Sequence, residues 1–482
     1  MSWILCHSVL NTLNLTTQMT SNLKQIEEIM MDQDYSPDQI LMFGELYKRF
    51  IAEKDTKIDW FNISTPSDNQ ILNYESLEEI QEDKIATLLS ELAVCRLNGG
   101  LGTSMGCVGP KSAIEVKNGL SILDLIVEQI HMLNLKYGSQ VPLVLMNSYS
   151  TDQDTQKIIG KYDNILPVYT FRQNEFPRLR TDSLLPLSKQ IYGQQCSYPP
   201  GHGDFYHSID KTGVLDQLLK NGKKYMYIAN ADNLGASVDL NILNLMEKSG
   251  APFIMEVTDK TRADVKGGTL IKTKNGSMRL LELAQVPKDH IEDFKSVKKF
   301  KIFNTNNIWI NLVELKKKLQ SNTLHLDIIV NRKNLEHLPI IQLETAIGSG
   351  INNFEGGLAV KVPRIRFIPI KKTDDLLLVQ SNLYIFEEGI IKKNPDRQFG
   401  GIPLIRLGNY FQTVEEYQNR FASIPDILDL DLLTIVGNVY FGKNITLRGN
   451  VILVCERGEL NLPDNSLLEN KVLTGSIQMG EL

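Results

Sequence analysis

The chain has 482 residues, of which 42% are hydrophobic and 22% are charged, a balance typical of a globular protein with two or three domains. Its formal net charge of −6 argues against a general nucleic-acid-binding surface. No apolar run approaches the roughly 18 residues needed to cross a bilayer, and the first residues lack the basic segment of a secretory signal, so we expect neither membrane nor nucleic-acid partners.

The cysteines indicate the compartment. They are Cys6, Cys95, Cys107, Cys196 and Cys455, with no C-x-x-C pair and no spacing typical of a metal site. An odd number of cysteines in a chain of this size fits a reduced protein better than a secreted one. We therefore expect a cytoplasmic protein without a zinc site.

The first segment with a clear pattern is helical. Residues 20–60 are polar, with apolar residues scattered among them at Ile26, Ile29, Met30, Phe43 and Tyr47. We interpret residues 1–45 as an N-terminal helical region that packs on the main domain.

A buried strand leads into the most informative stretch of the chain. The apolar run 92–95, with Leu97 after Arg96, predicts this strand. Residues 97–112 then read Leu-Asn-Gly-Gly-Leu-Gly-Thr-Ser-Met-Gly-Cys-Val-Gly-Pro-Lys-Ser, with Lys111 near the exit. Glycines let backbone N–H groups approach a ligand closely, and the lysine adds a positive charge. The stretch predicts a phosphate-binding loop, with an ordinary glycine-rich turn as the alternative.

Two widespread phosphate loops do not match this stretch. The dinucleotide fingerprint requires a third glycine at the position of Met105, and the P-loop does not allow Pro110 between its last glycine and its lysine. A different class of phosphate-handling protein is therefore indicated.

Strands and helices alternate after the loop. Ser121 is placed to cap a helix with apolar residues at helical spacing, and strands are predicted over 141–146, 168–171 and 225–229. This alternation predicts a parallel or mixed sheet in an α/β sandwich. Such sheets bind ligands at the carboxyl ends of their strands, where the glycine loop, Gln173 and Asp232 fall.

Asp232 is the candidate metal ligand. A loop aspartate often caps a helix or forms a turn. Beside a phosphate loop, however, it can hold Mg²⁺, because this hard cation takes few carboxylates and shares its ligands with phosphate oxygens.

Residues 364–372 alternate basic and apolar side chains in the order Arg-Ile-Arg-Phe-Ile-Pro-Ile-Lys-Lys. The alternation predicts a half-buried strand with one cationic face that includes Lys371. The alternative is a solvated basic face without function.

The C-terminal segment has a period of six. Aliphatic and aromatic residues recur every six positions in two series, one over 433, 439, 445 and 451 and the other over 435, 441, 447 and 453. We interpret this period as coils of a small parallel β-helix, with an alternating hairpin as the other possibility.

The glycine loop resembles that of the eukaryotic UTP–glucose-1-phosphate uridylyltransferase (UDP-glucose pyrophosphorylase) family. Further blocks resemble the family in the same order, from about residue 20 to the C-terminus. They are Pro-Pro-Gly-His-Gly-Asp at 199–204, Asn-Ala-Asp-Asn-Leu-Gly-Ala at 230–236, Thr-Arg-Ala-Asp-Val-Lys-Gly-Gly-Thr-Leu at 261–270, Phe-Asn-Thr-Asn-Asn at 303–307, Gln-Leu-Glu-Thr-Ala at 342–346 and Val-Pro-Arg-Ile-Arg-Phe-Ile-Pro-Ile-Lys at 362–371. Two departures are Val108, where family members often carry a basic residue, and Ala231, which varies the middle of its block.

The resemblance implies a fold and a domain division. The fold is a nucleotide-binding α/β/α sandwich with a mixed, mostly parallel sheet, of the glycosyltransferase A-like nucleotidyltransferase type, followed by a small C-terminal parallel β-helix. It implies a catalytic domain over residues 46–386 and a β-helix domain over 387–482.

The resemblance also implies site residues. Those for UTP are Leu97, Asn98, Gly99, Gly100, Lys111, Met146, Gln173, Gly201 and Lys371. Those for glucose 1-phosphate are Gly99, Gly100, His202, Asn230, Ala231, Asp232 and Asn306. Lys111 and Lys371 are expected to be catalytic, Asp232 is expected to bind Mg²⁺, and His202 is expected on an exposed turn stiffened by the prolines before it.

The implied reaction is reversible, Mg²⁺-dependent, in-line uridylyl transfer from UTP to glucose 1-phosphate, which gives UDP-glucose and pyrophosphate without a covalent enzyme intermediate. Two alternatives stay open: a UDP-sugar pyrophosphorylase of broader or N-acetylhexosamine specificity, and a non-catalytic sugar-nucleotide sensor. The expected partners are these small molecules, with self-association through the C-terminal domain as a further possibility.

Overall fold

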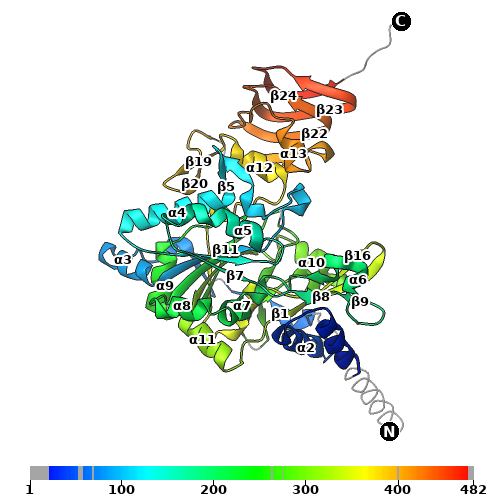
Figure 1. Ribbon diagram of the computed structural model, residues 1–482. Coiled ribbons are helices and arrows are strands. Elements are labelled where there is room, and N and C mark those ends of the chain that lie inside the picture. Colours follow the sequence, from blue (N-terminus) through cyan, green and yellow to red (C-terminus); the bar gives the residue numbers. More distant parts are fainter. Residues whose placement is uncertain are drawn as a thin grey trace.

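The computed structural model describes residues 21–52, 58–67, 70–261, 264–274, 276–398 and 401–475 (Figure 1). The N-terminal part is helical over residues 21–32 and in α2 (Pro37–Ala52). Phe43 and Tyr47 of α2 are fully buried, and the Phe43 ring packs edge-on against Phe176 with the ring centres 5.4 Å apart. Residues 21–32 and α2 are thus helical, and α2 packs on Phe176, whereas residues 1–20 lie outside the described ones.

The centre of the molecule is an eight-stranded sheet. Its strands lie in the order β2 (Ile71–Asn73), β18 (Leu358–Lys361), β12 (Phe253–Asp259), β15 (Ile302–Asn311), β11 (Tyr225–Asn230), β3 (Leu92–Asn98), β6 (Leu143–Asn147) and β7 (Val168–Arg172). The strand β15 runs antiparallel to its neighbours β11 and β12, and the other neighbouring pairs are parallel. The predicted mixed, mostly parallel sheet is confirmed.

Helices cover both faces of the sheet (Figure 1). One face packs against α3 (Glu82–Ser90), α4 (Ile122–Tyr137), α9 (Leu240–Ser249) and α12 (Thr373–Gln380), and the other packs against α7 (Phe205–Lys211), α8 (Val214–Lys220) and α11 (Leu312–Gln320). Successive strand residues point to opposite faces, so Val94 of β3 joins the first layer while Ala93 and Cys95 join the second. The α/β/α sandwich is confirmed.

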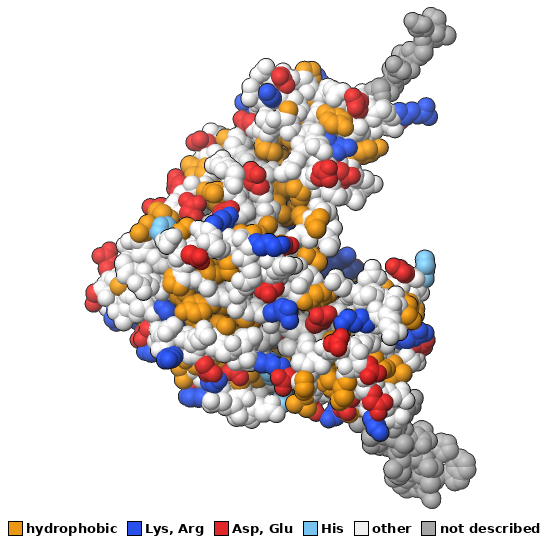
Figure 2. Space-filling model, viewed as in Figure 1, with side chains coloured by type: hydrophobic (Ala, Val, Ile, Leu, Met, Phe, Trp, Pro, Cys, Tyr) orange, Lys and Arg blue, Asp and Glu red, His pale blue; other side chains and the backbone are white. Residues whose placement is uncertain are grey.

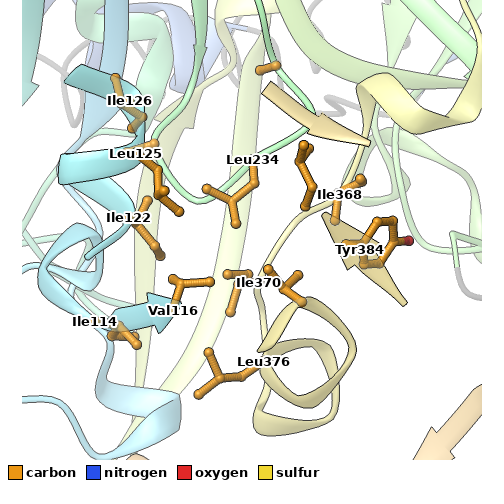
Figure 3. Close-up of a cluster of buried hydrophobic side chains, with 14 of the residues drawn as sticks. Ile114, Val116, Ile122, Leu125, Ile126, Leu234, Ile368, Ile370, Leu376 and Tyr384 are labelled. Atoms are coloured by element: carbon orange, nitrogen blue, oxygen red, sulfur yellow. The ribbon is translucent and has the colours of Figure 1, made fainter. Parts of the chain in front are cut away.

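Helix α4 begins where the sequence predicts. The Ser121 side chain accepts from the Asp124 backbone N–H, and the Asp124 carboxylate accepts from the Ser121 backbone in return. The apolar side of the helix then faces Leu234 and Ile370 (Figure 3). Burial of each such aliphatic side chain stabilises the fold by about 1.5–3 kcal/mol. This packing fixes the segments around residues 234 and 370 beside the start of α4.

The predicted strand over residues 364–372 is wrong. After β18 the chain forms the 3₁₀ turn η11 (Arg364–Arg366) and then runs without a regular strand to α12. The basic residues do not share a solvated face, because Arg366 is buried and Arg364 pairs with Asp264 at 2.9 Å. The alternation in this segment therefore reflects tertiary ion pairs and not strand periodicity.

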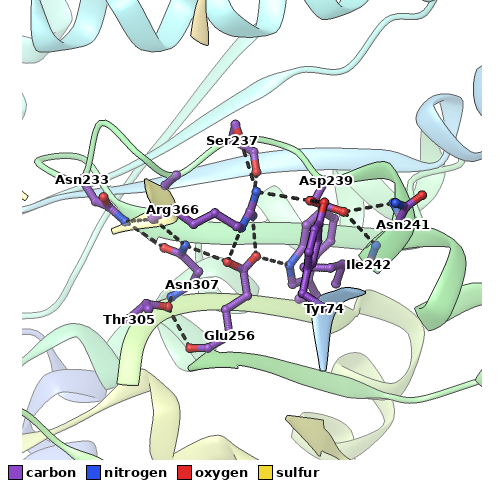
Figure 4. A network of polar contacts seen from close by, with 12 residues as sticks. Tyr74, Asn233, Ser237, Asp239, Asn241, Ile242, Glu256, Thr305, Asn307 and Arg366 are labelled. Atoms are coloured by element: carbon purple, nitrogen blue, oxygen red, sulfur yellow. Dashed lines mark hydrogen bonds and ion pairs between the residues drawn. The ribbon is translucent and has the colours of Figure 1, made fainter. Parts of the chain in front are cut away.

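A buried polar network holds this segment in place (Figure 4). The Glu256 carboxylate of β12 accepts from Arg366 Nε at 2.7 Å and Nη2 at 2.6 Å, from Trp309 Nε1 at 2.9 Å and from Asn307 Nδ2 at 3.0 Å. The Asn233 side chain joins the network, since its Nδ2 donates to Asn307 and its Oδ1 accepts from the Ile368 backbone. The loop after β11 is thereby fixed to the segment that leads to Lys371. Removal of one partner of a buried ion pair such as Glu256–Arg366 typically lowers the free energy of unfolding by about 3–5 kcal/mol.

The C-terminal part is a parallel four-stranded sheet at the opposite end of the molecule from α2 (Figure 1). Its strands are β21 (Leu404–Arg406), β22 (Leu430–Phe441), β23 (Thr446–Leu462) and β24 (Leu467–Gly475). The register pairs Leu433 with Val451, 18 residues apart, which is three of the six-residue steps. All eight positions of the two predicted series are buried. The predicted parallel β-helix is confirmed.

The predicted domain boundaries fall inside regular elements. The boundary after residue 45 lies within α2, and that after residue 386 lies within β19 (Tyr384–Glu387), which pairs with β20 (Ile390–Lys393). One cluster of buried apolar side chains continues from the central sheet into β22 and β23. The division into domains stays a prediction. In the part of the chain that the structure describes, no helix is long and apolar enough to span a membrane.

Candidate functional site

A cleft of about 280 Å³ lies at the carboxyl ends of β3, β6 and β11. Its lining contains every predicted site residue except Lys371 and Asn306, together with two residues that were not predicted, Ser112 and Pro199. The full lining is Leu97, Asn98, Gly99, Gly100, Lys111, Ser112, Met146, Gln173, Pro199, Gly201, His202, Asn230, Ala231 and Asp232. The sheet register explains this convergence, because Leu97 pairs with Asn230 and Asn98 pairs with Asn147 across neighbouring strands.

The glycine loop folds back on itself at the edge of the cleft. The Lys111 backbone N–H donates to the Gly100 carbonyl at 3.2 Å, and Leu101 bridges to Pro110. A Cβ atom at Gly99 would collide with the Gln173 amide, so glycine is required for Gln173 to reach the cleft. A Cβ at Gly100 would meet open space, so the backbone there is accessible to a ligand.

Asn98 anchors the loop from inside. Its Nδ2 donates to Asn147 Oδ1 at 2.9 Å and to Thr155 Oγ1 at 3.0 Å, and its Oδ1 accepts from Ser112 Oγ at 2.6 Å. Thr155 belongs to α5 (Asp152–Ile159), and Asn98 is buried. Because both amide protons of Asn98 are used inside the protein, the contribution of this residue to the cleft comes from its backbone.

Two opposite charges face each other in the cleft. Lys111 Nζ lies 2.8 Å from Asp232 Oδ2, and the side chains are 16% and 21% exposed. Within the described residues, no group of three His, Cys, Asp or Glu side chains could hold a metal ion, and Asp232 supplies the one carboxylate of the cleft lining. Mg²⁺ is usually held by one or two carboxylates plus substrate phosphates and water. A single carboxylate beside the glycine loop fits that ligand set.

His202 is not on an exposed turn, and that expectation is wrong. Gly201 and Gly203 on either side of it pack so closely on Thr345 that a Cβ at either position would collide. The His202 Nδ1 accepts from the Ile347 backbone N–H at 2.9 Å, so the ring proton lies on Nε2, which is left to act as a donor. Burial lowers the pKa of His202 to about 4, which keeps the ring neutral near pH 7. The packing on Thr345 joins the 199–204 and 342–346 blocks at one wall.

Asn306 lies beside the cleft on the neighbouring strand. The antiparallel register of β11 and β15 ends at the pair Ile228–Ile308, and Asn306 lies two residues before Ile308 in β15. Asn306 has a φ of 60°, a left-handed conformation that asparagine tolerates better than most residues. Its side-chain oxygen accepts a hydrogen bond from Asn304 Nδ2 at 2.8 Å, so its amide nitrogen remains as the group that can donate to a ligand.

Lys371 is exposed and stands apart from the cleft lining. Its ammonium group lies 5.8 Å from the centre of the Phe367 ring, and its backbone N–H donates to Asp375 Oδ2 at 2.8 Å at the start of α12. The positive charge of Lys371 acts on Glu282, a carboxylate that the sequence motifs did not indicate. Burial raises the pKa of Glu282 to about 7, and Lys371 opposes this rise. The signal that could have found it is a lone carboxylate in the apolar run 280–283.

Comparison with known proteins identifies the family. Residues 40–448 match the UTP–glucose-1-phosphate uridylyltransferase family. The chain is 49% identical over 448 residues to UTP–glucose-1-phosphate uridylyltransferase of Saccharomyces cerevisiae, covering 91% of this chain and 89% of that protein. It is 47% identical over 471 residues to UTP–glucose-1-phosphate uridylyltransferase 2 of Dictyostelium discoideum, covering 95% and 94%.

A solved structure supports the same assignment. A single-site mutant of UDP-glucose pyrophosphorylase from Leishmania major, in complex with UDP-glucose, superposes with a TM-score of 0.84 at 29% identity, covering 94% of this chain and 99% of that one. The resemblance predicted from the sequence motifs is therefore confirmed over nearly the whole length. The chain belongs to the UTP–glucose-1-phosphate uridylyltransferase family.

Proposed function

We propose that the protein transfers the uridylyl group of UTP to glucose 1-phosphate, which forms UDP-glucose and pyrophosphate in a reversible reaction. The observation that carries the proposal is the cleft, in which a glycine loop, Lys111 and Asp232 meet at the carboxyl ends of three adjacent strands. Family membership and the UDP-glucose complex of the Leishmania major relative support the same reaction.

The proposed UTP site lies between the glycine loop and the ends of β6 and β7. The Gln173 amide offers both a donor and an acceptor, which suits the edge of a uracil ring, and Leu97, Met146 and Gly201 complete that wall. The backbone of Gly99 and Gly100, with Lys111, then meets the phosphates. Lys371 approaches the phosphates from the opposite side after a movement of its exposed side chain.

The proposed glucose 1-phosphate site lies at the ends of β11 and β15. The neutral His202 ring donates from Nε2, and the Asn230 and Asn306 amides bind sugar hydroxyls. Gly99, Gly100, Ala231 and Asp232 border the same space. These groups orient the sugar phosphate so that its phosphate oxygen faces the α-phosphate of UTP.

Mg²⁺ is proposed as the cofactor, held by Asp232 together with phosphate oxygens. When bound, it supplies positive charge that stabilises the negative charge on the reacting phosphates. Lys111 lies 2.8 Å from Asp232, so a metal held by this carboxylate would take the place of the Lys111 ammonium. The lysine is then free to contact the phosphates.

The reaction requires no protein nucleophile, since the phosphate oxygen of the sugar phosphate is already anionic. The task of the protein is to hold two polyanions in line and to stabilise the charge that develops on the α-phosphate and the leaving pyrophosphate. The retained Lys111, Asp232 and Lys371 disfavour the alternative of a non-catalytic sensor, which would not need a metal ligand.

A substrate panel tests the proposal and its range. Pyrophosphate release is measured with UTP, Mg²⁺ and the 1-phosphates of glucose, galactose, xylose and N-acetylglucosamine. Glucose 1-phosphate is expected to give the highest kcat/KM. Comparable values for several sugars would favour a broad-range UDP-sugar pyrophosphorylase, and no turnover with any of them would favour a sensor.

Two further expectations, on location and on self-association, complete the proposal. A cytoplasmic location is supported by the described cysteines, Cys95, Cys107, Cys196 and Cys455, all of which are free thiols. Self-association through the C-terminal domain stays a prediction, for which exposed apolar residues on the β-helix, Val436, Leu467 and Val472, offer a surface. Self-association is measured by comparing the sedimentation velocity of the wild type with that of Val472→Asp.

A further inference from the structure

Asn233 is a buried side chain that joins three parts of the protein around the cleft. It follows Asp232 in the loop after β11, and only 1% of it is exposed. Because the side chain is buried, it can affect a bound substrate only through its neighbours. The question is therefore which neighbours it holds and how firmly.

The Asn233 amide uses its full hydrogen-bonding capacity inside the protein. Its Nδ2 donates to Asn307 Oδ1 at 3.2 Å and to the Arg366 carbonyl at 3.1 Å. Its Oδ1 accepts from the backbone N–H groups of Ile368 at 2.8 Å and of Gly235 at 3.2 Å. A primary amide offers two N–H donors and two acceptor lone pairs, so each of these has a partner. The partners belong to β15, to the segment before α12 and to the loop of Asn233 itself (Figure 4).

The backbone around Asn233 joins the loop to the same segment. Asn233 forms an antiparallel bridge with Pro369. The Ile370 N–H donates to the Asp232 carbonyl at 2.9 Å. The residue assigned to the metal is therefore joined by one backbone hydrogen bond to the residue that precedes Lys371.

Gly235 allows the two backbones to come into direct contact. A Cβ atom at Gly235 would lie 2.2 Å from the Ile365 carbonyl oxygen and 2.8 Å from the Arg366 carbonyl carbon. A side chain at this position would push the loop and the segment before α12 apart. The hydrogen bonds of Asn233 cross this contact and hold it closed.

We propose that Asn233 is a positioning residue for uridylyl transfer. It fixes the relative positions of Asp232, Lys371 and Asn306. Asp232 precedes it in the chain, Lys371 follows the segment that it binds, and Asn306 precedes its partner Asn307. The inference rests on the proposed function, in which these three residues meet the metal, the phosphates and the sugar. Because the transition state requires all three in line at once, a misplacement of about 1 Å can lower the rate by about 10²-fold.

The proposal explains why an amide stands at this position. An ionised aspartate would have no N–H for Asn307 and the Arg366 carbonyl, and leucine would also have no acceptor for Ile368. Three of the sequence blocks, 230–236, 303–307 and 362–371, therefore meet at one side chain that has both donors and acceptors.

Steady-state kinetics of Asn233→Ala test the proposal in the full chain. The variant keeps every residue assigned to the substrates but loses the bonds that align them. We expect kcat per folded protein to fall about 10- to 100-fold, while the KM values for UTP and glucose 1-phosphate change by less than about threefold.

The matched control is Asn244→Ala, which removes another buried asparagine. Asn244 lies in α9, is 2% exposed and donates to the Glu78 carbonyl at 3.2 Å. Its loss is expected to lower Tm and to leave kcat per folded protein at the wild-type value. Circular dichroism and Tm are measured for both variants, so that a loss of folded protein is separated from a loss of rate.

Three kinetic results would overturn the proposal: wild-type kcat in Asn233→Ala, an equal loss of kcat in Asn244→Ala, or a change confined to KM. A wild type without turnover is a distinct result, which would refute the proposed function and this inference with it.

Hydrogen exchange of the wild-type chain tests the same link if Asn233→Ala does not fold. The backbone N–H groups of residues 234–236 and of residues 368, 370 and 371 all have hydrogen-bond acceptors. If Asn233 holds the two segments together, these groups exchange slowly and at the same rate, as one cooperative unit. Much faster exchange at residues 368–371 than at residues 234–236 would show that the segment opens alone, and would overturn the proposal.

Discussion

Lys111 Nζ and Asp232 Oδ2 lie 2.8 Å apart, although 121 residues separate them in the sequence. The two side chains form an ion pair in the cleft. In the proposed complex, however, Asp232 is the metal ligand and Lys111 is the phosphate contact. The pair neutralises both charges until the substrate arrives. In the proposed complex, Asp232 would hold Mg²⁺ and Lys111 would contact the phosphates of UTP, so both side chains would keep a partner of opposite charge.

Asp232→Asn is expected to leave the fold intact and to remove most of the activity. The amide can still accept from Lys111, but it loses the negative charge that Mg²⁺ requires. Initial rates measured across a magnesium titration give the answer, with circular dichroism as the check on folding. Unchanged activity at limiting Mg²⁺ would exclude Asp232 as the metal ligand.

Lys371→Ala is expected to lower kcat by about 10²–10³, the usual loss when one preorganised charge facing the transition state is removed. Lys371→Arg should recover part of this loss, because a planar guanidinium does not reproduce a point charge at fixed reach. Steady-state kinetics in both directions measure the effect.

The matched control for Lys371 is Lys372→Ala, the adjacent exposed lysine. Lys371 lies over the Phe367 ring and acts on Glu282, whereas within the described residues no such interaction with Phe367 or Glu282 is found for Lys372. The control should be nearly silent. A large loss of kcat in Lys372→Ala with no loss in Lys371→Ala would refute the assignment of Lys371 to the phosphates.

Glu282 is expected to make stability depend on pH. Its folded pKa of about 7 lies above its ordinary value of 4.5, so its contribution to stability is fully present below pH 4.5 and is lost as pH rises through 7. Glu282→Gln stays neutral and should therefore gain stability relative to the wild type between about pH 5 and pH 8. Urea unfolding at both pH values measures the difference. The exposed Glu355→Gln is the control, and an equal change in both variants would contradict the burial argument.

His202→Gln is expected to remove a pH dependence of the opposite sign. The folded pKa of about 4 lies below the ordinary 6.5, so stability is present above pH 6.5 and is lost as pH falls toward 4. Urea unfolding at about pH 7 and pH 5 should show a larger loss for the wild type than for His202→Gln. A similar loss in both proteins would mean that the ring does not titrate as its burial requires.

A chain that ends near residue 430 is expected to keep a cooperatively folded catalytic core, because the coils of a β-helix contact mainly their neighbours. The truncation removes Phe441, which stacks on Phe421 with the ring centres 4.6 Å apart, so new apolar surface becomes exposed and solubility should fall. Urea unfolding followed by fluorescence tests this. The absence of any cooperative transition would refute a separate C-terminal domain.

Local sequence patterns were sufficient to predict an element where residues close together in the chain determine its structure. The Ser121 cap and helical spacing predicted α4, and the six-residue period predicted the C-terminal coils, because in both cases neighbours along the chain set the pattern. The carboxyl-end rule for parallel strands was enough to predict that the glycine loop, Gln173 and Asp232 share one cleft.

Long-range contacts explain what the patterns missed. Arg366 resembled part of a strand face, but its geometry is set by Glu256, 110 residues away. His202 resembled a residue on an exposed turn, and packing of its neighbours on Thr345 and its bond to Ile347 place it half-buried in the cleft wall. The position of Glu282 near Lys371 likewise depends on how distant segments pack. None of these contacts leaves a periodic trace in the sequence.

The most direct test of the central claim measures pyrophosphate release from UTP in the presence of glucose 1-phosphate, with the wild type and Lys111→Ala assayed side by side. The wild type is expected to release pyrophosphate only when the sugar phosphate is present. Lys111→Ala, folded but without the cleft ammonium, is expected to lose about 10²–10³ in kcat. No pyrophosphate from the wild type, or equal rates for both proteins, would contradict the assignment of this cleft as the site of uridylyl transfer.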